Sequence, residues 1–517
     1  MTRRRPWALA VLGVAVVAVV CLPLLYLLIR VIGGGDAAWA AFGRPRTLEL
    51  VVRTVGLVAA VTALSVAVGL PAAWLVSRTD LPGRKVWAVL LALPLVLPSY
   101  VVALALLAIS GPGGLLGIPA IAGFDGATLA LTLATYPYVF ILCAAALRRA
   151  DPALEEASRG LGRGPWATMR AVTLPLIAPA IGAGALLVAL YALADFGVVS
   201  LMRVDVLTRA IYVEYRSLFD RTPAAVLGLV LVVLAAVVVL AEGWMSRRAR
   251  GAARSSGRVA PPVPLGRWMV PALAFCGVVT GVALVLPLAV LVWWIARAPS
   301  AGDVLENIAG PAANSLLVAL AAAAVTTLAA IPVAVLAVRH RGRATRALER
   351  AAYVGNALPG IVIALALVFF AARNASLLYG TLTLLIVAYL VRFFPQALAG
   401  VRSALERVDP NLEDAARGLG APPPAVLARV TVPLMAPGLL AGAALVFLST
   451  MKELPATLLL RPIGFDTLAT EVWTTTSVSR YAEAAPPALA LCVLAAPVVW
   501  LLVVRGGREW DELGGGA

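Results

Sequence analysis

Long uncharged apolar runs, separated by short polar segments, dominate the hydrophobicity pattern of this chain. The first run, Trp7–Ile29, has 23 residues and follows three arginines. A helix that crosses the hydrocarbon core of a bilayer needs about 20 mostly apolar residues, so runs of this length predict transmembrane helices. Eleven further runs follow: Val55–Ser77, Val86–Leu107, Ala127–Leu147, Val172–Ala194, Pro223–Ala241, Trp268–Ile295, Ile308–Val338, Ala351–Ala372, Ala375–Val391, Val430–Met451 and Ala484–Val504.

Composition and charge favour an all-α, polytopic membrane protein. Of the 517 residues, 62% are hydrophobic and 13% charged, and the mean hydropathy is +0.96. Soluble domains carry about 25% charged residues, so an ordinary soluble enzyme is excluded. With the N-terminus inside, 28 basic residues fall in inside segments and about 10 in outside loops. This positive-inside bias predicts a multi-pass protein of the cytoplasmic membrane with both termini in the cytoplasm, and it explains the net charge of +16 without nucleic-acid binding.

One polar segment divides the predicted helices into two sets of six. Residues 247–267 are rich in Arg, Gly, Ser and Pro, a composition typical of a solvated linker. The sequence therefore predicts a first membrane half at residues 1–246, a cytoplasmic linker, and a second membrane half at residues 268–517.

The two halves contain the same sequence pattern. Residues 151–179 and 409–437 align without a gap at an offset of 258, and 17 of the 29 positions are identical. Segments 97–106 and 358–367 also match, at an offset of 261. Corresponding segments face the same side in the predicted topology. The halves are therefore expected to form a parallel repeat about an axis along the membrane normal.

Each repeated segment predicts two short helices joined at a glycine. Asp151-Pro152 and Asp409-Pro410 are typical helix starts, with Asp as the N-cap and Pro in the first turn. A connection that only reversed the chain would need a few residues, so we expect a cytoplasmic docking loop rather than a helix that rests on the membrane. The residues expected to matter are Glu155, Glu156, Ala157, Gly162 and Pro175 in the first copy, and Glu413, Asp414, Ala415, Gly420 and Pro433 in the second.

This spacing resembles the EAA loop of ABC importer permeases, whose pattern is EAA, three residues, Gly, nine residues, Ile, one residue and Leu-Pro. The second copy has Asp414 in place of Glu and Val432 in place of Leu, with the spacing unchanged. The resemblance covers nearly the whole chain and implies a fused, two-half permease with the type I importer fold. It also implies that each loop is a coupling helix, which fits a cleft in an ATP-binding subunit and transmits closure of the ATPase dimer to the membrane helices.

The resemblance further implies the partners of the chain. These are a cytoplasmic ABC ATPase homodimer, which carries ATP and Mg, and an extracytoplasmic solute-binding protein. The two lysines of the chain, Lys85 and Lys452, do not lie in a phosphate-binding loop. The chain is thus expected to be a translocation subunit without enzymatic activity or a cofactor of its own. Residues 451–473 resemble the ferric-iron importer branch, so ferric iron is the leading substrate, and thiamine, phosphonate, sulfate-like anions and polyamines are alternatives.

Three charged residues near the predicted outer ends of spans are candidates for the pathway or gate. Asp195 and Glu453 are equivalent in the repeat, and Lys452 precedes Glu453. Charges at such positions are costly and often functional, but a role in helix packing is the alternative. The four cysteines are far apart and His340 is the single histidine, so we expect no metal site.

Two longer external segments, residues 201–222 and 458–483, carry mixed charge. They are either solvated surfaces or landing surfaces for the binding protein. A twelve-helix secondary transporter is the alternative function from another class, and it leaves the paired loops unexplained.

Overall fold

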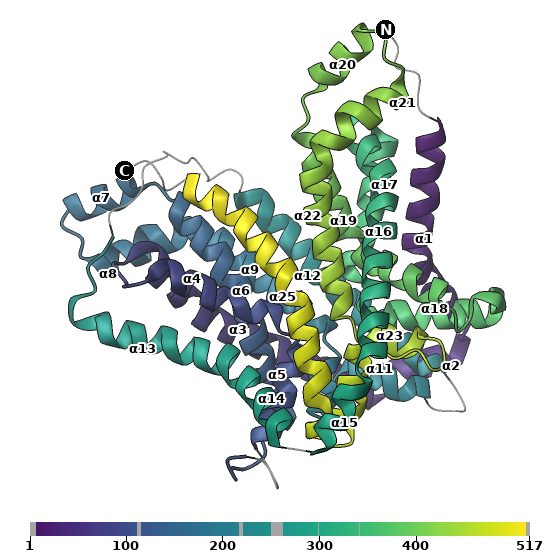
Figure 1. Cartoon of the computed structure of the whole chain (residues 1–517), viewed down its shortest axis with the longest axis horizontal. Coiled ribbons are helices and arrows are strands. Elements are labelled where there is room, and N and C mark those ends of the chain that lie inside the picture. Colours follow the sequence, from purple (N-terminus) through teal and green to yellow (C-terminus); the bar gives the residue numbers. More distant parts are fainter. Residues whose placement is uncertain are drawn as a thin grey trace.

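The computed structural model of the chain is a bundle of helices (Figure 1). It describes residues 7–110, 115–216, 221–249, 262–297, 299–340 and 342–512. In this part of the chain, ten helical segments are long and apolar enough to cross a membrane, and two bent helix pairs bring the number to twelve if each pair counts as one span. The ten are α1 (Trp7–Ile32), α3 (Pro45–Arg78), α6 (Gly123–Arg149), α9 (Leu174–Ala194) with the turn before it, α12 (Thr222–Ala249), α13 (Met269–Thr280) joined to α14 (Leu286–Arg297), α16 (Ala309–Arg339), α19 (Leu382–Glu406), α22 (Val432–Met451) with the turn before it, and α25 (Tyr481–Glu512).

Small residues let neighbouring spans approach closely, as packing in lipid requires. A Cβ built on Gly400 of α19 would lie 2.9 Å from the Gly442 Cα of α22, so only glycine fits this crossing. Shorter helices connect the spans: α2 (Gly35–Phe42), α10 (Gly197–Leu201), α11 (Leu207–Arg216), α15 (Pro299–Asn307), α23 (Pro455–Leu460) and α24 (Leu468–Ser477).

Two of the expected continuous spans are broken, which corrects the prediction for Val86–Leu107 and Ala351–Ala372. In the first half, α4 (Arg84–Ala92) and η1 (Leu93–Val96) meet α5 (Ser99–Ile109) at a 90° bend. In the second half, α17 (Arg343–Ala352) and η5 (Tyr353–Ala357) meet α18 (Gly360–Asn374) at 104°. Each bend follows a Leu-Pro pair, and proline disfavours helical backbone in the residue before it.

The span expected at Ala375–Val391 lies further along the chain, at α19. The apolar run in the sequence ends at Arg392, but the helix continues past it to Glu406. Arg392 is accommodated because its guanidinium Nη1 donates a hydrogen bond to the Leu358 carbonyl oxygen at 2.6 Å. A charged residue inside an apolar span therefore does not mark a helix end when a polar group elsewhere in the bundle forms a hydrogen bond with it.

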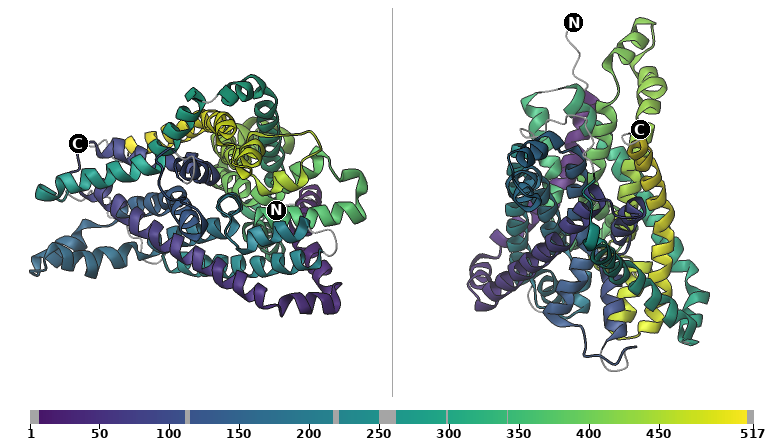
Figure 2. Two further views of the ribbon diagram at one scale, coloured as in Figure 1. Left: turned by 90° about the horizontal axis from the view of Figure 1, so that it is seen from below. Right: turned by 90° about the vertical axis from the view of Figure 1, so that its left-hand side faces the viewer.

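The two halves exchange helices (Figure 2). Buried residues of α1 and α12, from the first half, share one core with α16, α18 and α19. Buried residues of α13, α14 and α25, from the second half, share the other core with α3, α5 and α6. Each core thus combines helices from both halves.

The predicted linker falls largely outside the described residues, which resume at Pro262. There the Val263 N–H donates to the Arg78 carbonyl at 2.8 Å, so the end of the linker is fixed beside α3. The assignment of residues 1–246, 247–267 and 268–517 as two halves and a linker stays a prediction.

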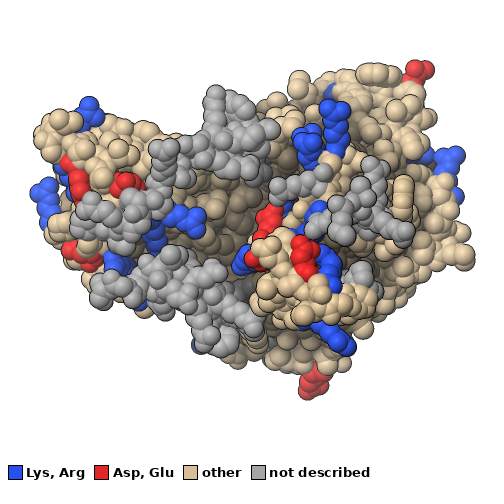
Figure 3. Space-filling view, turned by 90° about the horizontal axis from the view of Figure 1, so that it is seen from above, with Lys and Arg blue, Asp and Glu red and all other residues tan. Residues whose placement is uncertain are grey.

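Both repeated loops project from the same side of the bundle. Figure 1 places α7 (Pro152–Gly160) and α20 (Pro410–Gly418) on the side where α1 begins and α25 ends. Seen from that side, the visible surface forms two lobes with a hollow between them, and charged side chains gather on each lobe (Figure 3).

Candidate functional site

Each repeated loop folds as two short helices joined at a glycine, as the sequence predicts. In the first copy, Asp151 caps α7 by accepting a hydrogen bond from the Ala153 N–H at 3.0 Å. Gly162 follows α7 with φ of +79°, a left-handed conformation that favours glycine. The chain then passes through α8 (Pro165–Thr168) and the π-helical turn η2 (Met169–Thr173) into the span α9.

The second copy repeats this geometry. Asp409 accepts from the Asn411 N–H at 2.9 Å, and Gly420 has φ of +84°. After α20, the chain passes through α21 (Pro423–Val426) and the π-helical turn η7 (Leu427–Thr431) into α22. The predicted prolines Pro175 and Pro433 lie in the first turns of α9 and α22.

A buried ion pair, here called the latch, fastens α7 to the membrane bundle. Arg78, at the end of α3, places Nη2 at 3.3 Å from Glu155 Oε1, and the two side chains are 5% and 10% exposed. Thr173 Oγ1, in the π-helical turn, donates to the same carboxylate oxygen at 2.9 Å. Arg78 Nη2 also donates to the Ala150 carbonyl at 3.4 Å. Arg78 therefore contacts the start of the loop and its helix, and Glu155 connects this pair to the return of the loop through Thr173.

The second half contains the same latch. Arg339, at the end of α16, donates through Nη2 to Glu413 Oε1 at 3.1 Å and to the Val408 carbonyl at 3.0 Å. Thr431 Oγ1 donates to Glu413 Oε1 at 3.1 Å. Sequence reasoning selected the two glutamates but missed the arginines and threonines. The repeat was the available signal, because Thr173 matches Thr431 at the offset of 258 and Arg78 matches Arg339 at the offset of 261.

The remaining predicted loop residues face outward. Glu156, Ala157, Asp414 and Ala415 are exposed, in contrast to the buried latch glutamates beside them. The outer face is also apolar, because Leu161 and Leu419 occupy equivalent turns and are 83% and 89% exposed. Each loop is thus held from the inside and presents an apolar tip with flanking acids to its surroundings.

The predicted pathway residues lie at the two helix breaks. Asp195 follows α9, is 8% exposed, and accepts from Ser99 Oγ at 2.6 Å at the start of α5. Its other carboxylate oxygen accepts from the Val198 N–H at 2.9 Å. An acid at the start of a helix satisfies free N–H groups and suits the positive end of the helix dipole.

Glu453 takes the equivalent position in the second half with a different pair of residues. Gly360 stands where the first half has Ser99, and a Cβ there would collide with Glu453 Oε1. The longer glutamate thus fills the space that serine occupies in the first half. The exchange of Asp and Ser for Glu and Gly preserves an acid at each break.

Cations satisfy the carbonyl groups on the other side of the breaks. Lys452 Nζ donates to the Leu95 carbonyl at 2.6 Å, across the boundary between the halves. At the second break, Arg392 donates to the Leu358 carbonyl, which belongs to the same half. Among the contacts of the described residues, Lys452 forms no ion pair with Asp195 or Glu453. No group of three or more His, Cys, Asp or Glu in that part of the chain is arranged to hold a metal ion. The gate function of the three residues stays a prediction.

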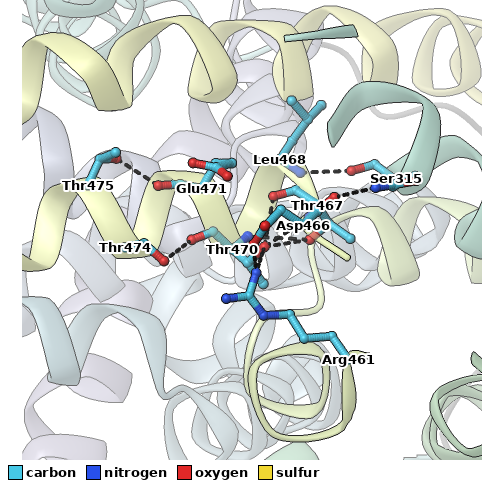
Figure 4. A network of polar contacts seen from close by, with 10 residues as sticks. Ser315, Arg461, Asp466, Thr467, Leu468, Thr470, Glu471, Thr474 and Thr475 are labelled. Carbon is cyan, nitrogen blue, oxygen red and sulfur yellow. Dashed lines mark hydrogen bonds and ion pairs between the residues drawn. The ribbon is translucent and has the colours of Figure 1, made fainter. Parts of the chain in front are cut away.

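The segment between α23 and α24, which the sequence predicts to be external, forms a braced turn (Figure 4). Arg461 pairs with Asp466 and donates to Thr470 Oγ1 at 3.1 Å. Burial lowers the pKa of the Arg461 guanidinium from its ordinary value, and the nearby Glu471 carboxylate opposes this shift. The Leu468 N–H donates to Ser315 Oγ at 2.8 Å, which ties the segment to α16. The turn presents Ile463, which is fully exposed.

Comparisons with known proteins identify related chains. The model of the family "binding-protein-dependent transport system inner membrane component" matches residues 65–251 and 326–505. A Fe(3+)-transport system permease protein of Haemophilus influenzae is 32% identical over 512 residues, covering 97% of this chain and 99% of that protein. A molybdenum transport system permease protein of Escherichia coli is 32% identical over 192 residues, covering 34% and 84%. A putative 2-aminoethylphosphonate transport system permease protein of Salmonella typhimurium is 28% identical over 264 residues, covering 48% and 98%.

The latch makes a prediction about local stability. Replacing Arg78 by Gln should speed hydrogen exchange of the α7 amides by at least about tenfold, because breaking a buried ion pair costs about 3–5 kcal/mol. The α20 amides should exchange at the unchanged rate, and Arg339→Gln should have the reverse effect. Hydrogen exchange read by mass spectrometry measures both helices at once.

Arg159→Gln is the matched control for this experiment. Arg159 approaches the same glutamate at 3.6 Å, but its side chain is 44% exposed. Such surface pairs contribute about 0–1 kcal/mol, so exchange should change little. Unchanged exchange of α7 in Arg78→Gln would show that the latch does not hold the loop.

Proposed function

Because the chain belongs to the family of binding-protein-dependent transport system inner membrane components, we propose that it forms both halves of the pore of an ATP-driven ferric-iron importer. The chain is the permease subunit of an ABC importer and is not itself catalytic. A system of this kind includes an ATPase and a solute-binding protein. The proposal adds the substrate, the docking surfaces and the orientation.

The duplicated, latched loops carry this proposal. Two copies of one apolar tip, on one side of the bundle, suit the two equivalent subunits of an ATPase homodimer. Leu161 and Leu419 are the proposed anchors, because burying an exposed leucine contributes about 1.5–3 kcal/mol. Glu156 and Asp414 flank them and supply the polar rim. The latch glutamates, Glu155 and Glu413, transmit force to α3 and α16 instead of contacting the partner.

Each loop leads directly into a span that ends at a broken helix. The helical segment Met169–Ala194 connects the first loop to Asp195, and Ala428–Met451 connects the second to Lys452 and Glu453. At 1.5 Å per residue, the first is about 39 Å long. A displacement of a loop is therefore expected to reach the bend in the same half, where the acids form the gate.

Two observations support the proposed orientation and binding-protein contact. The positive-inside bias puts the loops, the N-terminus and the C-terminus in the cytoplasm. The braced turn around Ile463 then lies on the extracytoplasmic side. Its exposed apolar tip on a rigid base suits a contact with the solute-binding protein.

Ferric iron is favoured by the relative that aligns with both halves, whose printed name is an Fe(3+)-transport system permease. Buried acids at both breaks also suit a hard cation. The molybdenum and aminoethylphosphonate permeases align with smaller parts of the chain. Molybdate or phosphonate is therefore the second candidate substrate, carried by the same machinery, and thiamine, sulfate-like anions and polyamines rank after them.

The docking surfaces can be tested with charged substitutions. Leu161→Asp and Leu419→Asp should each weaken binding of the cognate ATPase by at least about tenfold, because each removes one apolar anchor. The double variant should lose transport-coupled ATP hydrolysis. Binding is measured with the chain in lipid nanodiscs. Leu377→Asp is the control, since Leu377 is equally exposed on the opposite side. Wild-type binding by the double variant would refute the docking surface.

The substrate can be tested by reconstitution. The chain, its ATPase and its binding protein in lipid vesicles should accumulate ferric ion with ATP hydrolysis, and should not accumulate molybdate. Asp195→Asn with Glu453→Gln should reduce uptake several-fold, because changed pairing at a break costs about 1–3 kcal/mol. Glu306→Gln, at an exposed acid of α15, should leave uptake unchanged. Accumulation of molybdate instead of ferric ion would refute the iron assignment alone.

The braced turn gives a separate prediction. Ile463→Asp should leave basal ATP hydrolysis of the assembled complex intact and should reduce its stimulation by loaded binding protein, because it removes an apolar contact. Titration of the complex with binding protein measures the effect. Leu377→Asp is the control here, because Leu377 is an exposed apolar residue on the same side of the bundle as Ile463. Equal stimulation of wild type and Ile463→Asp would exclude this turn from the contact.

A further inference from the structure

A cavity rich in arginine lies where α1 meets α18, at the boundary between the two halves. It has a volume of about 240 Å³. Its walls come from the end of α1, the residue before α12, and the end of α18. We call it the arginine pocket, and its lining residues are Tyr26, Arg30, Arg221, Phe369, Ala372 and Arg373.

Aromatic rings hold two of the three guanidinium groups in place. Arg30 lies over the Phe369 ring at 5.5 Å, and Arg221 lies over the Tyr215 ring at 5.1 Å. Tyr26 donates from its hydroxyl to the Phe369 carbonyl at 3.3 Å, which fixes α1 against α18. The cations are therefore brought together by built contacts from three segments of the chain.

The pocket lining contains three cations and no carboxylate. Within the described part of the chain, none of the three arginines has an ion pair, and the buried Arg30 Nε has no hydrogen-bond partner. A single arginine at a helix end often extends to the membrane surface without any ligand. That explanation does not account for three that converge on one cavity. Converging like charges repel each other, and an anion that binds between them removes this cost.

The donor geometry favours a phosphate group among anions. Guanidinium groups present paired N–H donors that match the oxygens of phosphate, and Arg is the usual residue for this recognition. The elements that flank the pocket also expose large apolar and aromatic side chains, namely Ile32 of α1, Trp39 of α2, and Leu377 and Tyr379 after α18. Exposed Trp and Tyr are typical of the membrane–water interface, where phospholipid headgroups lie.

We propose that the arginine pocket binds a phosphate group at the extracytoplasmic membrane surface, and that an anionic phospholipid carries it. The phosphate bridges α1 and α18, and so links the first helix of one half to the broken helix of the other. Free phosphate has the same chemistry, and the experiment separates the two sources.

The test uses the purified full chain in neutral detergent, with phosphatidylglycerol, phosphatidylcholine or inorganic phosphate as the probe. Phosphatidylglycerol should bind saturably in native mass spectrometry and raise Tm, whereas the zwitterionic phosphatidylcholine should not. Arg30→Gln and Arg373→Gln should each weaken this binding by about tenfold, as expected for loss of a charged hydrogen-bond donor. Arg373 is exposed, so its substitution is compatible with folding even where that of Arg30 is not.

Arg297→Gln is the matched control, because Arg297 lies over the Trp293 ring at 5.6 Å but does not line the pocket. It should bind phosphatidylglycerol as the wild type does. Binding of inorganic phosphate without phosphatidylglycerol, lost in the same two variants, would keep the phosphate site and overturn the lipid as its source. Binding of neither probe, or equal binding by the wild type and both pocket variants, would overturn the proposal.

Discussion

A backbone carbonyl or N–H group that is left open inside a bilayer has no water to bind, and this constraint explains where the chain places its few intramembrane charges. Both bent helix pairs open such groups at a Leu-Pro break. Lys452 and Arg392 donate to backbone carbonyls before the breaks, and Asp195 accepts from the Ser99 hydroxyl at the helix start that follows the first break. Cations at helix C-termini and anions at N-termini also match the helix dipole. The bends are stable because side chains from other helices complete their hydrogen bonding.

The same division between satisfied and open groups separates the two neighbouring acids of the first loop. Glu155 is buried because Arg78 and Thr173 compensate its charge, whereas Glu156 one position later is exposed. A buried charge without such partners would cost several kcal/mol. Fixing the inner acid makes the loop a rigid extension of α3 and α9, and a rigid loop can transmit a displacement along α9. Glu156 is left for a partner, whereas its equivalent in the second loop, Asp414, pairs with Arg417 at the surface.

The length of the apolar runs predicts an all-helical membrane chain, and the repeat predicts the two loops with their helix starts and glycine turns. Hydropathy does not reveal the breaks, because Leu97-Pro98 lies inside an apolar run and the run scores as one span. It also misplaces α19, because Arg392 reads as a helix end until its partner carbonyl is known. Hydropathy misses the latch arginines for a related reason. Arg78 lies at the end of a predicted span, where hydropathy does not distinguish it from an ordinary positive-inside charge. What is missing in each case is the partner, which lies far away in sequence.

Both halves need a cation to bind a backbone carbonyl at the break, but they use different residues. One of these residues connects the two halves. The second half supplies the cation for its own break through Arg392, but the equivalent position in the first half is Ala134. The first break is instead served by Lys452 from the second half, whose own equivalent is Ala194. Lys452 directly follows α22, the span that rises from the second loop. Relative motion of the halves must therefore either carry the first bend along or break this hydrogen bond. While the bond holds, a displacement that begins at the second loop acts on both breaks.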